Sequence, residues 1–204
     1  MKKVISLTLC ALLFIAAFAG CGQKGLTTEV ASGWYEFNLT PEQCKEQMNR
    51  LIQEESSKIG DLEKKEYDGT PSAKSVEKIA DYKYDYADSI GNFTIMNDGG
   101  RDKILIVSNC LYTDEATPGA EDAWKEINRA TLRTLLPKLS EKKCEEILSE
   151  LGETDPASRT EGYEKSTTLD GTKISLVFQA ADPNKSYTKN SLSIHVTPVQ
   201  PEKK

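Results

Sequence analysis

Histidine is nearly absent from this sequence, and the common catalytic motifs are missing altogether. The one histidine, His195, cannot by itself supply a two-histidine metal site, and it makes a poor candidate for a triad. No Cys-x-x-Cys, His-Glu-x-x-His, Gly-x-Ser-x-Gly or phosphate-loop motif occurs. The sequence therefore predicts no catalytic residue, no cofactor and no metal site. Alternation with Leu192, Ile194 and Val196 predicts that His195 is an ordinary exposed side chain on the opposite face of a strand.

Basic residues are in the minority, with 26 Lys and Arg against 32 Asp and Glu, which gives a net charge of −6. Nucleic-acid binding is therefore not expected, because that function usually shows as a basic patch. The acidic residues are spread along the chain, which is typical of a solvated surface. Their number leaves one enzymatic alternative open, a hydrolase that uses paired carboxylates, although the sequence does not indicate which pair.

Long apolar runs are missing beyond Cys21, where the longest is Ile104–Val107, far too short to cross a bilayer. The one long run is Val4–Phe18, which follows Lys2 and Lys3 and carries no charge. A basic start followed by such a run is typical of an export signal, and it is short for a membrane-spanning helix.

The four residues Phe18-Ala19-Gly20-Cys21 directly after this run resemble the lipobox of bacterial lipoproteins. The resemblance implies a signal peptide over 1–20, a lipid such as palmitate on Cys21, and a membrane-anchored protein on the extracytoplasmic face of the cell envelope. Several acyl chains on one residue form a stable anchor. Residues 21–33, polar and rich in glycine, are then expected to be a lipidated tether. The alternative is an ordinary secretory peptide that is cleaved nearby and leaves Cys21 a plain thiol.

Three further cysteines, Cys44, Cys110 and Cys144, lie in apolar patterns, so we expect buried free thiols. A disulfide between Cys44 and Cys144 is the alternative.

Two segments one hundred positions apart both read as helix starts, at Leu39–Glu46 and at Leu139–Glu146. Thr40 and Ser140 suit the N-cap, and Gln43 completes a capping box. Apolar residues then follow on one helical face, and Gly152 ends the second helix. Between the two segments, Asp122–Leu136 is expected to be a further amphipathic helix.

Strand signals follow each helical segment. In the first half they are the alternating Tyr82–Tyr86, Phe93–Met96 and Lys103–Tyr112, with the turn Asn97–Gly100 between the last two. In the second half they are Thr167–Leu169, the turn Asp170-Gly171, Lys173–Gln179 and Leu192–Val196, and Trp34–Asn38 offers one more strand.

The sequence thus predicts an α+β fold of two tandem units, each with a helical segment followed by a three-stranded antiparallel meander. The expected units are 34–115 and 116–198, with a polar tail over 199–204. This arrangement is similar to the β-lactamase-inhibitor proteins and to small outer-membrane assembly lipoproteins, in architecture only.

The three rings of Tyr82, Tyr84 and Tyr86 alternate along one strand and form the candidate binding surface, for a protein, peptide or glycan partner. The alternative is that they cover the helix of their own unit. We expect a non-enzymatic lipoprotein that binds a partner or ligand at the membrane, with the hydrolase and an assembly factor of an envelope complex as the alternatives.

Overall fold

The computed structural model describes residues 26–55, 62–64, 79–84, 91–97, 102–185 and 188–201. The described helices are α2 (Pro41–Glu55), α3 (Pro118–Leu135), α4 (Glu141–Leu151) and the short 3-10 helix η1 (Pro156–Arg159). The described strands are β1 (Thr27–Ala31), β2 (Trp34–Phe37), β3 (Leu62–Lys64), β4 (Ile79–Tyr84), β5 (Gly91–Asn97), β6 (Ile104–Tyr112), β7 (Glu164–Leu169), β8 (Thr172–Gln179) and β9 (Ser191–Pro198).

Side chains cap each of the three α-helices at its start. The Gln43 N–H donates to Thr40 Oγ1 at 3.2 Å, and Gln43 Oε1 accepts from the Thr40 N–H at 3.0 Å. Ser140 Oγ accepts from the Lys143 N–H in α4, and Thr117 Oγ1 from the Ala120 N–H in α3. These bonds satisfy backbone donors that a helix leaves free at its first turn. The capping predicted at Thr40 and Ser140 is confirmed.

All described strands join one antiparallel sheet, in the order β3-β4-β5-β6-β9-β8-β7, with the β1–β2 hairpin attached to β6 through Phe37 and Ile104. The first four strands of this order are neighbours in sequence, and so are the last three. They meet where β6 pairs with β9, from Val107 opposite Val196 to Tyr112 opposite Ser191. The predicted α+β class with antiparallel strands is confirmed.

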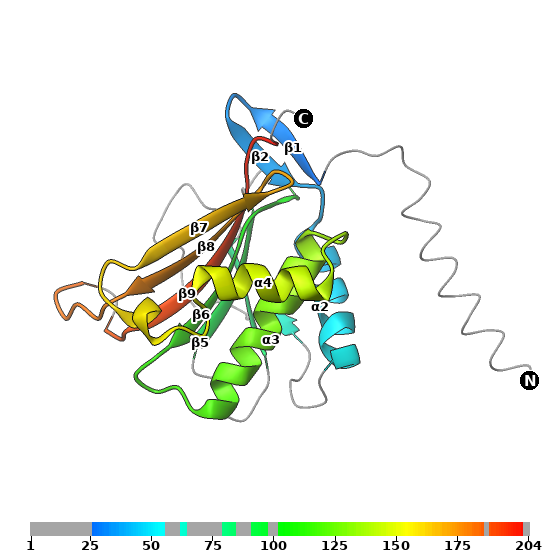
Figure 1. Cartoon of the computed structure of the whole chain (residues 1–204). Helices are drawn as coiled ribbons and strands as arrows, with labels where there is room; N and C mark the ends of the chain where they lie inside the picture. Colours follow the sequence, from blue (N-terminus) through cyan, green and yellow to red (C-terminus); the bar gives the residue numbers. More distant parts are fainter. Residues whose placement is uncertain are drawn as a thin grey trace, which may run out of the picture.

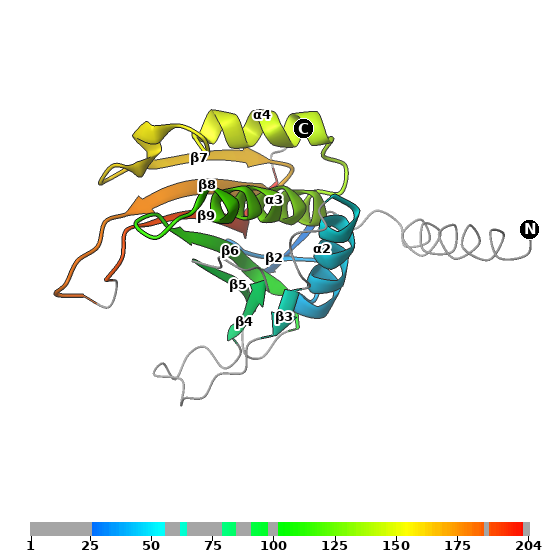
Figure 2. The ribbon, with the colours of Figure 1, turned by 90° about the horizontal axis from the view of Figure 1, so that it is seen from below.

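The three α-helices lie along one face of this sheet (Figures 1 and 2), and the core fills the space between. Helix α3 packs on β6 and also contacts α2 and α4. Alternate residues of the central strands point toward the helices and are buried, among them Val107, Ile174 and Ile194. Side chains from both halves of the chain belong to the same core cluster.

The tether predicted over residues 21–33 is wrong in its second half, because Thr27–Ala31 forms β1 and pairs with β2. Only Thr27 of this strand is buried, so the segment TTEVA lacks the apolar alternation by which strands are recognised. A two-residue turn links the strands, with Gly33 at a φ of 77°, a left-handed conformation that glycine adopts readily.

Cys44 and Cys144 are buried free thiols, as expected, whereas Cys110 is only partly buried. Burial raises the pKa of both buried thiols to about 12. Because the thiolate is the reactive form, these cysteines act as small apolar side chains of the core.

Candidate functional site

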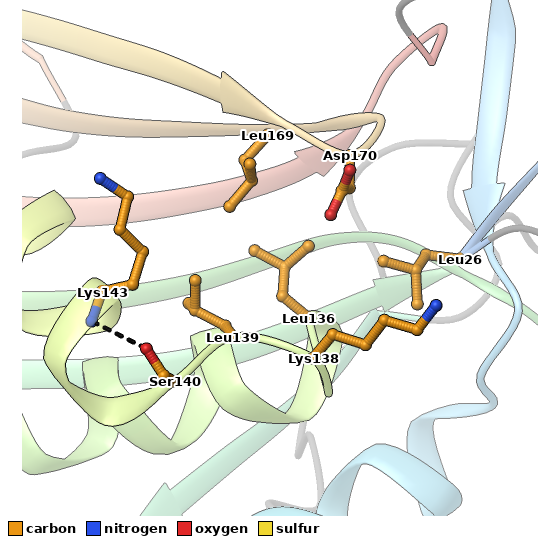
Figure 3. A pocket seen from close by; sticks show the side chains of 8 residues that line it. All are labelled: Leu26, Leu136, Lys138, Leu139, Ser140, Lys143, Leu169 and Asp170. Carbon is orange, nitrogen blue, oxygen red and sulfur yellow. Dashed lines mark hydrogen bonds between the residues drawn. The ribbon is translucent and has the colours of Figure 1, made fainter. Parts of the chain in front are cut away.

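A pocket of about 250 Å³ opens between the start of β1, the corner joining α3 to α4, and the β7–β8 turn. Figure 3 shows leucine side chains in its wall, with the Asp170 carboxylate directed toward them and the Lys138 amine at the edge nearest Leu26. The lining residues are Leu26, Leu136, Lys138, Leu139, Ser140, Lys143, Leu169 and Asp170. The pocket thus combines an apolar wall with two cations and one anion.

The end of helix α3 and the β7–β8 turn position the residues that line this pocket. Helix α3 ends where the Leu136 N–H donates to Leu132 O at 2.8 Å, and Pro137 follows, which cannot continue the helix. On the other side, Asp170 and Gly171 have φ angles of 48° and 76°, the positive values that a two-residue hairpin turn with a type I′ backbone requires. The Gly171 carbonyl accepts from the Val199 N–H at 2.8 Å, which fixes the end of the chain against this turn.

The β1–β2 hairpin carries the largest exposed apolar side chain of the described residues, Trp34, which is 62% exposed. Trp34 follows the turn residue Gly33 and pairs with Ala31. The Gly33 N–H donates to Glu29 Oε1 at 3.1 Å, so this backbone donor of the turn is satisfied by a side chain of the same hairpin. The hairpin stands clear of the helices in Figure 1.

A buried polar network joins the sheet to the helices. Asn109 of β6 donates from Nδ2 to the Trp124 carbonyl at 3.1 Å and to Asn128 Oδ1 at 2.7 Å, and Trp124 Nε1 donates back to Asn109 O at 3.2 Å. Asn128 Nδ2 in turn donates to Glu153 Oε1 at 2.8 Å. These bonds satisfy polar groups that would be costly to bury alone, and they fix α3 and the end of α4 on β6.

Glu153 is the charged member of this network and is only 3% exposed. Burial raises the pKa of its carboxyl group, and the hydrogen bond from Asn128 and the charge of Arg129 oppose that rise. Arg129 itself is paired with Glu145. The carboxyl therefore lies in an apolar layer with a single direct donor among the described hydrogen bonds.

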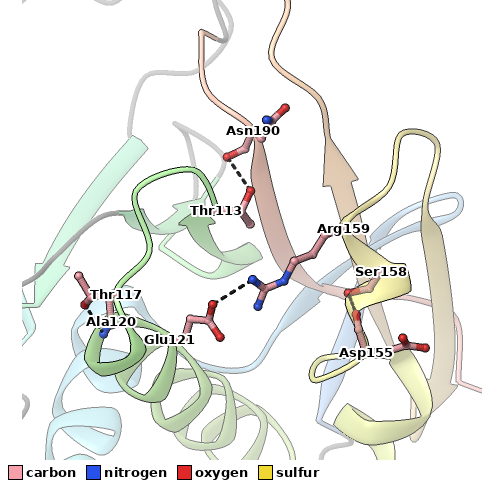
Figure 4. A network of polar contacts seen from close by, with 8 residues as sticks. All are labelled: Thr113, Thr117, Ala120, Glu121, Asp155, Ser158, Arg159 and Asn190. Atoms are coloured by element: carbon pink, nitrogen blue, oxygen red, sulfur yellow. Dashed lines mark hydrogen bonds and ion pairs between the residues drawn. The ribbon is translucent and has the colours of Figure 1, made fainter.

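Ion pairs and hydrogen bonds tie the loops together at the end of the sheet where β6 runs into α3 (Figure 4). Arg159 of η1 donates to Glu121 of α3 at 2.9 Å, and this hydrogen bond lowers the pKa of Glu121. Thr113 Oγ1 donates to the Asn190 carbonyl at 3.4 Å. Glu115 pairs with Lys189, and Glu121 pairs with Arg159.

The sheet face opposite the helices holds His195 between two serines, because β9 pairs it with Ser108 of β6 and with Ser175 of β8. Strand alternation predicted this face correctly. The side chain is half-buried rather than exposed, and burial lowers the pKa of His195, with the charge of Glu164 acting in the opposite direction. Its Nδ1 is buried and has no hydrogen-bond partner within the described part of the chain.

Two of the four predicted site residues lie within the region that the structure describes. Cys21 and Tyr86 lie outside the described residues, and Tyr82 and Tyr84 are described as positions in β4. Tyr82 pairs with Phe93 of β5, which is 2% exposed. Paired positions in antiparallel strands share a face, so position 82 lies on the face of Phe93. The tyrosine binding surface stays a prediction.

Sequence reasoning missed the pocket, Trp34 and the Asn128–Glu153 contact. The pocket needs three elements distant in the chain, and the Asn128–Glu153 bond spans 25 positions, so neither leaves a local signal. Trp34 carried a signal: a tryptophan next to glycine in a polar stretch is poorly placed for a core.

Carboxylates do not gather in the pocket, where Asp170 is the one acidic lining residue. Glu153, the buried carboxyl described above, does not line it. Within the described ranges no group of three or more His, Cys, Asp or Glu side chains is placed to hold a metal ion. Nor does a helix of the described part have the length and apolar character to span a bilayer.

The sequence matches no family model, and comparisons with curated proteins and with solved structures found no significant match.

Proposed function

We propose that this chain is a cell-envelope lipoprotein, anchored through a lipid on Cys21, whose α+β domain binds a partner close to the membrane. The observation that carries the proposal is the order of features along the chain: a basic start, the uncharged run Val4–Phe18, the lipobox-like Phe18–Cys21, and then a described fold that begins at Leu26. Four residues separate the proposed anchor from Leu26. The domain is therefore held within a few tens of ångströms of the lipid.

Metabolic labelling with palmitate tests the anchor. The wild-type protein is expected to take up label and to stay with the membrane fraction, and Cys21→Ala is expected to lose both properties. Cys10→Ala is the matched control, because this cysteine lies in the run that would be removed with the signal peptide, and its substitution leaves labelling unchanged. Persistent labelling of the Cys21→Ala protein would show that the anchor is elsewhere.

The pocket supports the binding half of the proposal. Its volume of about 250 Å³ is below the range typical of pockets that enclose a drug-sized molecule. A pocket of this size fits one apolar side chain or end group of a larger partner, and Lys138 favours an acidic group beside it. It lies next to Leu26, so a partner seated there would be close to the anchor.

Site-specific photo-crosslinking tests this contact in cells. A photoreactive side chain at position 143 is expected to trap one partner of defined mass, while the same side chain at position 142 traps none. Lys142 is the matched control, because it is adjacent, fully exposed at 89% of its side chain, and does not line the pocket. Equal trapping at both positions, or none at position 143, would rule out the pocket as the contact.

The proposal also includes a tandem origin of the two halves. Support comes from the two helix starts at Thr40 and Ser140, which carry the same N-cap hydrogen bond, and from the sequential strands that follow each helical segment. Exchanging the capped segments 39–46 and 139–146 tests this idea. A folded protein of near wild-type stability is expected, and an unfolded one would argue against equivalent units.

A further inference from the structure

We propose that the tip of the β1–β2 hairpin is a membrane-contacting element and that Trp34 lies among the lipid headgroups when the protein is anchored. The inference rests on the proposed function for the position of the anchor. The inference goes beyond the proposed function because it assigns a surface of the folded domain, residues 30–35, to contact with the lipid. The surface contacts the membrane–water interface.

The first argument is the contrast in exposure. Trp34 is 62% exposed, whereas the core of the described residues buries its large apolar side chains almost completely. Keeping an indole in water forgoes the free energy of burying a large apolar surface. Tryptophan is enriched where proteins meet the membrane–water interface, because its ring is apolar and its N–H is polar. An exposed indole on a chain held at a membrane is suited to that interface.

The second argument is the chemistry of the tip. Val30, Ala31, Ser32, Gly33, Trp34 and Tyr35 are six consecutive residues without charge. Glu29 and Glu36 flank this stretch: Glu36 is 4% exposed, and the exposed Glu29 carboxylate accepts from the Gly33 N–H at 3.1 Å. Unsatisfied backbone donors are costly at a membrane, and this turn keeps the Gly33 N–H bonded. The carboxylate of Glu29 limits the contact to the headgroup layer, because charged groups are costly to bring into the bilayer core. Tyr35 adds a second ring with a polar end.

The third argument is reach. The five residue steps from Cys21 to Leu26 extend at most about 18 Å, taking roughly 3.3–3.6 Å per step. The five residues of β1 rise about 17 Å, at roughly 3.3–3.4 Å per residue, from Thr27 to the turn. The anchor and the hairpin tip can therefore reach the same plane. Figure 1 shows the hairpin projecting away from the helices.

The chain has two tryptophans, which allows a direct test. A protein in which residues 1–21 are replaced by a histidine tag is bound to zwitterionic vesicles that contain nickel-chelating lipid, with and without brominated acyl chains. Trp34 is expected to be quenched by the bromines and to shift its emission to shorter wavelength. Trp124 is 1% exposed and supplies a constant signal. Trp34→Phe is expected to abolish both the quenching and the shift.

A displaced indole is the matched control. In the Trp34→Phe background, Ala181→Trp places one exposed tryptophan in the loop after β8, at the end of the sheet far from the hairpin, and no quenching is expected there. Equal quenching at positions 34 and 181, or none at position 34, overturns the inference.

The two proposals fail separately in this design, because the tag replaces the lipid. Palmitate label that persists in the Cys21→Ala protein, or no label on the wild-type protein, would remove the anchor at Cys21 and leave the quenching result standing. An unquenched Trp34 on the tethered protein would remove the membrane contact and leave the anchor standing.

Discussion

Trp124 and Trp34 stand in two regions that treat the same side chain in opposite ways. Trp124, in α3, is 1% exposed, and its Nε1 donates to the Asn109 carbonyl within the helix–sheet interface. Trp34, at the hairpin tip, is 62% exposed. In the first region the indole ring is buried and its N–H is hydrogen-bonded within the chain, so Trp124 stabilises the fold. In the second region most of the indole is exposed, so Trp34 is suited to contact something outside the fold. The comparison predicts opposite sensitivities to substitution.

The largest effect is expected for Trp124→Ala, which creates a cavity between α3 and β6 and removes the hydrogen bond to Asn109. Replacing a buried aromatic residue by alanine typically costs about 3–5 kcal/mol. Urea unfolding followed by circular dichroism measures this loss. A cost below about 1 kcal/mol, the centre of the range for single substitutions, would show that the interface repacks and that the contrast with the hairpin is weaker than the exposures indicate.

Asn128→Ala comes next, because it leaves the Asn109 amide and the Glu153 carboxyl without their common partner. An unsatisfied buried polar group costs about 1–3 kcal/mol. Asn184→Ala is the control, since Asn184 is exposed in the loop after β8 and its substitution is expected to change stability by less than about 0.5 kcal/mol. Equal effects of the two substitutions would indicate that water replaces the network.

Glu153→Gln is expected to act in the opposite direction at neutral pH. Burial raises the pKa of Glu153, so the folded state binds its proton more tightly than the unfolded chain does. The resulting stability is fully present below the ordinary pKa of 4.5 and is lost as pH rises through the raised value. At pH 7 the glutamine variant, which keeps an oxygen for Asn128, is expected to gain on the order of 1 kcal/mol. Below pH 4.5 the gain disappears, and unfolding curves at both pH values check the sign.

The smallest effect on folding is expected for Trp34→Ala, within about 0.5 kcal/mol of the wild type, as is usual at exposed positions. Thermal unfolding of the two proteins side by side measures it. A large loss of stability would mean that Trp34 packs within the fold. Trp34 and Trp124 would then both stabilise the folded chain, and the comparison would fail.

The parts of the fold that the sequence predicted are those with a local cause. Thr40 and Ser140 act within one helical turn, and Asp170-Gly171 determines its own turn, so both could be recognised from a few residues. Strand β1 was missed because one buried residue in five gives no alternation. The Asn109–Asn128–Glu153 network could not be predicted, because its members become neighbours only after β6, α3 and α4 have packed.

The pairing of β6 with β9 has a consequence for how the protein can be made. Thr113 bonds to Asn190 across 77 positions of the chain, at the point where the two strands meet. Contacts between such distant positions form late, since a long loop must close first. The central pair of the sheet is thus completed only when β9 is available. If the chain crosses a membrane from its N-terminus, the sheet stays incomplete until β9 has crossed, and the preceding segments can pass as unfolded chain.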